Sequence, residues 1–198
     1  MLQTNVARLD PIDQETEEWC VVIETPKGSR NKFAYDPECG LFELGKVLPR
    51  GTAFPFDFGF VPSTAGGDGD PLDVLVIMDE PAFPGCRVRC RLIGVIEAEQ
   101  TTKRGVVRND RLIAVAEECR EDTCVRSLKD LPDGLVEEIQ HFFTSYHELD
   151  GKRFRPLARH GPRRAEKLVR EGVKRFRAAG GDRAEPPANG KSAGAGTG

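Results

Sequence analysis

The sequence predicts a mainly β fold: a small closed, OB-like barrel of five strands with two or so α-helices packed outside it. Two observations lead to this prediction. Short stretches rich in β-branched and aromatic residues, separated by Gly, Pro and Asn, fill residues 19–116. Apolar residues then recur at helical spacing between residues 135 and 176. Many short strands followed by two helices suit a barrel that is covered from outside.

The strands are indicated by two kinds of pattern. Residues 87–99 alternate between apolar and basic side chains, as a half-buried strand does, whereas residues 74–78 form a continuous apolar run typical of a buried strand. The expected strands are residues 19–25, 32–36, 41–48, 54–61, 74–78, 87–99 and 112–116. The last of these is expected to end the β part of the chain.

Two helices are expected after the strands. The first begins at Leu135, with Asp133 as its N-cap after Pro132. Its apolar face is formed by Ile139, Phe142, Phe143 and Tyr146, and that of the second helix by Ala165, Leu168, Val169, Val173 and Phe176. The 11 basic residues within 152–177 are expected to form a solvated helix face.

The length of 198 residues suits one domain with two extensions. We expect an N-terminal arm at 1–18, a folded domain at 19–177, and a disordered tail at 178–198 that is rich in Gly, Ala and Pro. Because no run approaches the ~20 apolar residues of a membrane helix and the first residues are polar, we expect a cytoplasmic protein without a membrane partner. The net charge of −3 argues against a nucleic-acid partner.

An acidic cluster, Asp68, Asp70 and Asp73, lies immediately before the apolar strand at 74–78. Like charges this close raise one another's pKa unless a cation compensates them. Carboxylate oxygens without nearby sulfur or imidazole suit Mg²⁺, Mn²⁺ or Ca²⁺. An EF-hand is excluded, because Asp73 stands where its loop needs Gly and Asp79 where it needs Glu. An acidic surface turn remains an alternative, since Asp-Gly is common in turns.

Several segments resemble the family I soluble inorganic pyrophosphatases. The stretch G-D-G-D-P-L-D-V-L-V at 67–76 resembles the family signature D-x-D-P-x-D-V, and F-P-F-D-F-G-F-V-P at 54–62 resembles its aromatic strand. V-V-I-E-T-P at 21–26, followed by Lys32, resembles its first strand and its lysine strand. The resemblance implies a pyrophosphatase-like domain at 19–177 and hydrolysis of pyrophosphate by a water molecule that Mg²⁺, or Mn²⁺, activates. It also implies a homo-oligomer, either a dimer or a hexamer.

The resemblance further implies a role for each candidate residue. Asp70 would be the general base that takes a proton from water. Metal ligands would be Asp68, Asp73 and Asp110, and Glu24 would orient water or metal from behind them. Phosphate oxygens would be bound by Lys32, Lys46, Arg111 and Tyr146.

The sequence departs from the family pattern around this site. Ala34 replaces a Glu, Phe58 a Tyr and His147 a Lys, and Asn109 stands at a metal-binding Asp. Either Asp110 or the pair of Glu97 and Glu99 would then supply the missing charge, and we expect a smaller or weaker metal complement. Two other functions are compatible with these changes: a non-catalytic phosphate- or nucleotide-binding relative, and a hydrolase of another phosphoanhydride.

Overall fold

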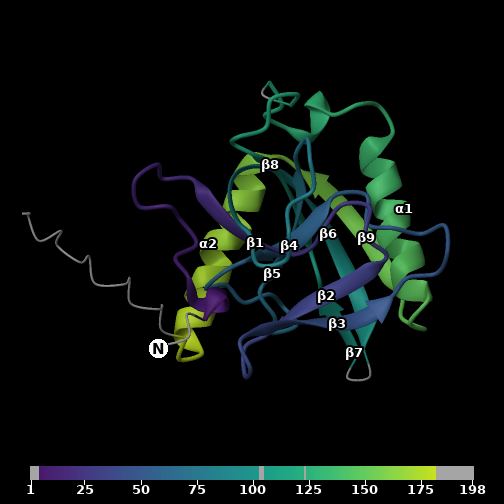
Figure 1. The fold of residues 1–198 in the computed structure, drawn as a ribbon, viewed down its shortest axis with the longest axis horizontal. Helices are drawn as coiled ribbons and strands as arrows, with labels where there is room; N and C mark the ends of the chain where they lie inside the picture. The colour runs from purple at the N-terminus through teal and green to yellow at the C-terminus, as the bar shows by residue number, and fades with distance from the viewer. Residues whose placement is uncertain (1–4, 103–104, 123, 182–198) are drawn as a thin grey trace, which may run out of the picture.

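The computed structural model describes residues 5–102, 105–122 and 124–181 (Figure 1). Its strands are β1 (Trp19–Thr25), β2 (Asn31–Asp36), β3 (Leu41–Val47), β4 (Asp57–Val61), β5 (Leu72–Ile77), β6 (Arg87–Thr102), β7 (Gly105–Arg108), β8 (Arg111–Ala116) and β9 (Phe154–His160). Its α-helices are α1 (Leu135–Glu148) and α2 (Pro162–Ala178), and two 3₁₀ turns lie at Val6–Arg8 and Leu128–Asp130.

Five strands close into a barrel in the order β1-β4-β5-β8-β6, because β6 also pairs with β1. Strands β5 and β8 run parallel, with Val74 opposite Leu112, and the other neighbours are antiparallel. Strands β2 and β3 form a separate hairpin, which lies beside the barrel in Figure 1. The predicted OB-like barrel with two helices is confirmed.

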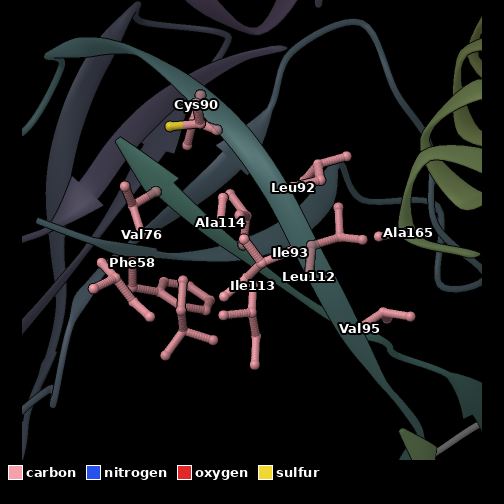
Figure 2. Packing of buried hydrophobic residues seen from close by; sticks show 14 of the residues in the cluster. Phe58, Val76, Cys90, Leu92, Ile93, Val95, Leu112, Ile113, Ala114 and Ala165 are labelled. Atoms are coloured by element: carbon pink, nitrogen blue, oxygen red, sulfur yellow. The ribbon is translucent and has the colours of Figure 1, made fainter. Parts of the chain in front are cut away.

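The barrel core is formed by apolar residues that are buried on both faces of the central strands. Every residue of β4 and β8 is buried, and apart from Asp57 and Arg111 at their first positions these residues are apolar or glycine. Ile93 and Ile113 belong to one buried cluster, which also includes Ala165 of α2 (Figure 2). Gly59 is required where β4 crosses β1, because a Cβ there would lie 2.0 Å from the carbonyl oxygen of Val22.

Three features of the secondary structure differ from the sequence prediction, and the first is strand β7, which was not expected. Residues 112–116 are not the last strand, because β9 follows and pairs with β6. Pro156 is tolerated in β9 because it lies at a register shift opposite Ala98. The predicted N-cap Asp133 was wrong: α1 begins after Gly134, whose φ of 84° favours glycine.

The described part of the N-terminal segment lies against the barrel. The hydroxyl of Tyr35 lies 3.3 Å from Oδ1 of Asn5, the amide of Ser63 donates to the carbonyl of Ala7, and Ile12 forms a β-bridge with Trp19. At the other end, α2 extends to Ala178, and residues 182–198 of the predicted tail lie outside the described residues. Neither α-helix that the structure describes combines the length and the apolar character needed to cross a membrane.

Candidate active site

A cavity of about 740 Å³ opens where the barrel faces the β2–β3 hairpin and the C-terminal part of α1. It brings together residues from distant parts of the chain. The sequence-predicted residues in its wall are Glu24, Lys32, Asp68, Asp70, Asp73, Arg111 and Tyr146. The two other predicted residues, Lys46 and Asp110, lie outside this wall.

The acidic loop, residues 66–73, is shaped by its own backbone hydrogen bonds. The amide of Gly66 donates to the carbonyl of Asp70 at 2.6 Å, and the amide of Asp70 donates to Oδ1 of Asp68 at 3.2 Å. Gly67 packs against β7, where a Cβ would lie 2.8 Å from Cβ of Arg108. In an extended chain Asp73 would point away from Asp68 and Asp70. Because the loop is bent, all three residues line one cavity.

Two carboxylates of the acidic loop, Asp68 and Asp70, form no ion pair with the described residues, whereas Asp73 is paired with Arg111. Desolvation raises the pKa of Asp68, and the charges of Asp70 and Asp73 raise it further. Desolvation also raises the pKa of Asp70, with Asp73 as the second cause. The other cavity acid, Glu24, is already paired with Lys32 at 2.7 Å. A hard cation at the loop would therefore relieve repulsion that the protein leaves unbalanced.

The three loop carboxylates are too widely spread to enclose one ion together. Within residues 5–102, 105–122 and 124–181, the group of three whose ligand atoms all lie within 4.8 Å of one another is Asp36, Cys39 and Glu43, on the β2–β3 hairpin. The loop thus fits cations that keep water ligands, as Mg²⁺ usually does, and does not fit a closed protein cage.

Arg111 is the central cation of the cavity, and only 3% of its side chain is exposed. Its NH1 lies 2.6 Å from Oδ2 of Asp73, and its NH2 lies 3.3 Å from Nε2 of His147. Burial, followed by the charge of Arg111, lowers the pKa of His147 to about 3. His147 is therefore neutral near pH 7, and its Nε2 accepts the hydrogen bond from the guanidinium.

Lys46 lies beside the cavity and is engaged by α1 and the loop that follows it. Its Nζ lies 2.6 Å from Oδ2 of Asp150 and 3.7 Å from the ring centre of Tyr146. Burial raises the pKa of Tyr146, so its hydroxyl remains a protonated donor. Tyr146 therefore offers a neutral hydrogen bond to the cavity, and Lys46 would have to leave Asp150 to reach a ligand there.

Asp110 lies outside the wall of the main cavity. Its Oδ1 accepts from the amide of Ala98 at 2.9 Å and from Arg108 at 2.8 Å, in the wall of a second hollow of about 280 Å³ behind the acidic loop. The alternative pair is also engaged, since Glu97 contacts Arg108 at 3.0 Å and Glu99 contacts Arg155 at 2.6 Å. The metal-binding role of Asp110 stays a prediction that this position does not favour.

Gln100 and Lys152 are among the cavity residues that were not identified from the sequence. Gln100 accepts a hydrogen bond from Nδ2 of Asn109 at 2.7 Å, so this part of the wall is a neutral amide pair. Lys152 also lines the cavity, and its amide donates to the carbonyl of His147. Among the described residues, no carboxylate forms an ion pair with Lys152. Its only sequence signal is its place in a generally basic segment.

The fold and the site together define a small barrel protein whose acidic cavity is flanked by lysine and arginine. Comparison with known proteins identifies the group to which it belongs. The family model described as inorganic pyrophosphatase matches residues 21–177. The chain belongs to the inorganic pyrophosphatase family.

Individual relatives agree with this assignment along nearly the whole chain. An inorganic pyrophosphatase of Streptomyces coelicolor is 44% identical over 170 residues, which cover 83% of this chain and 99% of the relative. One from Geobacillus stearothermophilus is 40% identical, covering 78% and 91%. The crystal structure of the Thermus thermophilus inorganic pyrophosphatase has a TM-score of 0.80 at 36% identity, covering 88% of this chain and 99% of that one.

Proposed function

We propose that this chain hydrolyses inorganic pyrophosphate to two orthophosphates. The observation that carries the proposal is the arrangement of the cavity, in which two unpaired carboxylates, Asp68 and Asp70, share a wall with Lys32, Arg111 and Lys152. Membership of the pyrophosphatase family supports it. Pyrophosphate is small and highly charged, so a site needs cations to bind it and carboxylates to hold metal and to accept a proton.

The phosphate oxygens are bound by basic residues and by one hydroxyl. Lys32 and Arg111 donate charge-assisted hydrogen bonds, and Tyr146 donates a neutral one from its hydroxyl. Lys46 joins them when its ammonium leaves Asp150. Because Lys32 and Arg111 are held by carboxylates and aromatic rings, they are already oriented before the substrate arrives, which lowers the entropy cost of binding.

Asp70 accepts the proton of the attacking water. Its raised pKa moves it toward the range in which a carboxylate is an effective base, and it has no ion-pair partner among the described residues. Of the three metal ligands predicted from the sequence, Asp68 is the one we retain, because Asp73 is paired with Arg111 and Asp110 with Arg108. Glu24 orients the group bound in front of it. Mg²⁺ is the metal we propose, with Mn²⁺ as the substitute. A bound divalent cation supplies charge neutralisation at phosphate and lowers the pKa of a coordinated water.

The test is phosphate release from pyrophosphate with Mg²⁺ and then with Mn²⁺, beside a panel of nucleotides and polyphosphate. We expect turnover on pyrophosphate that requires the metal. Turnover on nucleotides alone would instead indicate a hydrolase of another phosphoanhydride. Binding of phosphate without any turnover would indicate a non-catalytic relative.

We also propose that the chain forms a homo-oligomer. Apolar side chains on β3 are largely exposed, with Leu41 at 60%, Leu44 at 55% and Val47 at 55%. Exposed apolar groups of this kind are typical of interaction surfaces. Sedimentation equilibrium measures the mass directly, and a monomer at micromolar concentration would contradict the proposal.

A further inference from the structure

One guanidinium nitrogen lies among oxygens in the wall of the cavity. NH1 of Arg111 lies 2.6 Å from Oδ2 of Asp73, 3.2 Å from the carbonyl oxygen of Asp110 and 3.3 Å from that of Asn109. It also contacts the side-chain oxygen of Asn109. Four oxygens, from one carboxylate, one amide and two backbone carbonyls, therefore surround a single positively charged group.

These oxygens are the types that hard divalent cations take as ligands in proteins. A guanidinium satisfies them with a positive charge that is part of the chain and does not diffuse away. The parallel pairing of β5 and β8 fixes the arrangement, since Val74 lies opposite Leu112 and the preceding residues, Asp73 and Arg111, therefore meet.

The guanidinium is held in this position from its other sides. Its carbon lies 4.8 Å from the ring centre of Phe143 and 5.3 Å from that of Phe154, and its NH2 contacts Nε2 of His147. Its Nε has no hydrogen-bond partner among the described residues. This nitrogen is itself buried, so the described polar contacts of the guanidinium are made by NH1 and NH2.

We infer that Arg111 is a resident cation: it occupies the oxygen-lined position between Asp73 and Asn109, and this position consequently takes no divalent ion. Metal binding is then confined to the side of Asp68 and Asp70. This inference rests on the proposed function, because it concerns the same metal-binding cavity. It means that part of the positive charge facing pyrophosphate is built into the chain and is present at any metal concentration.

A second explanation would give the same low number of ions. The wall contains neutral amides, Asn109 and Gln100, so it could simply lack the charge to attract a cation. The two explanations predict different substitutions that would allow an additional ion to bind. If Arg111 fills the position, removing its charge opens it; if charge is lacking, adding a carboxylate at 109 is sufficient.

The experiment counts bound Mn²⁺ per chain without substrate, by isothermal calorimetry and by the loss of the free-ion electron paramagnetic resonance signal. We expect Arg111→Gln to bind one more Mn²⁺ per chain than the wild type, and Arg111→Lys and Asn109→Asp to bind the wild-type number. Arg91→Gln is the control, because it removes the same charge from an ion pair with Glu117, and both residues lie outside the cavity wall. It should leave the count unchanged.

An unchanged count in folded Arg111→Gln would overturn the inference, as would an extra ion in Asn109→Asp with Arg111 in place. Circular dichroism and thermal melting establish folding, and Asn109→Asp decides the question if Arg111→Gln does not fold. The counts are independent of turnover. A wild type that fails to hydrolyse pyrophosphate would therefore refute the proposed function and leave the resident-cation inference to be judged on the ion counts.

Discussion

Replacing Asp70 by Asn should remove most of the turnover and leave the fold and ligand binding largely intact. The change is nearly isosteric, and it breaks no ion pair among the described residues. The backbone carbonyl of Asp70, which accepts from Gly66 and holds the acidic loop, is unaffected. The substitution also removes one of the like charges that raise the pKa of Asp68. Stability should therefore be unchanged or slightly higher.

The expected loss follows from what a general base contributes. Proton transfer to a positioned side chain accelerates a reaction by about 10²–10⁴-fold. At about 1.4 kcal/mol per tenfold, this corresponds to about 3–5 kcal/mol of activation free energy. Because Asp70 contributes to proton transfer and not to the binding of phosphate, the loss should appear in kcat, with KM changing much less.

The assay is initial-rate phosphate release at saturating Mg²⁺, with calorimetric binding of a non-hydrolysable diphosphonate to show that the site is intact. Glu99→Gln is the control. It makes the same chemical change on β6, at a residue outside the cavity wall whose only ion-pair partner within the described part of the chain is Arg155. Turnover of Asp70→Asn within tenfold of the wild type would refute the assignment of Asp70 as the base.

Four further predictions concern binding, metal removal, acid stability and packing. Lys152→Met should raise KM about tenfold or more, because it removes a charged hydrogen bond worth ~1.5 kcal/mol. Arg153→Met is the control and should leave KM unchanged, since Arg153 lies outside the cavity wall. Equal KM values for the two variants would contradict the role of Lys152. A metal supplied at 100 times its Kd should stabilise the folded protein by ~2.7 kcal/mol, so its removal by a chelator should lower Tm by about 5–11 °C. An unchanged Tm after chelation would argue against a bound metal. The pKa of His147 is lowered to about 3, so the folded state resists protonation of this residue. The free energy of unfolding should therefore fall as pH drops from 6.5 toward 3. In urea titrations, His147→Asn should show a smaller decline over this range. Gly59→Ala should lower the free energy of unfolding by about 3 kcal/mol or more, because the added Cβ would clash with the Val22 carbonyl. An unchanged midpoint of urea unfolding would contradict this prediction.

The fold was largely predictable because its strands are encoded by local patterns. Alternation at 87–99 and the apolar run at 74–78 identified β6 and β5 within a few residues of their observed ends. Strand β9 was missed because its outward residues are charged and it contains Pro156. Its stability depends on partners far along the chain, such as Glu99 for Arg155 at 2.6 Å, and no local pattern reports such a pairing.

The site was predictable only in part, for a similar reason. Asp68, Asp70 and Asp73 are neighbours in sequence, so their meeting in one cavity could be expected. The contact between Asp73 and Arg111 is set by the register of β5 against β8, and the contact of Lys46 with Asp150 joins residues 104 positions apart. Such distant pairings determine which charges are available to a ligand, and they need the folded structure.

The seam between β1 and β6 has a consequence for how the chain is made. Trp19 pairs with Cys90, so the first strand of the barrel acquires its second neighbour only after about 70 more residues have been synthesised. At translation speeds of 5–20 residues per second, this delay is about 3–14 s. During that interval the largely apolar strand β1 has an unpaired edge on the nascent chain. Nascent chains halted before Arg87 should therefore be the species that chaperones bind.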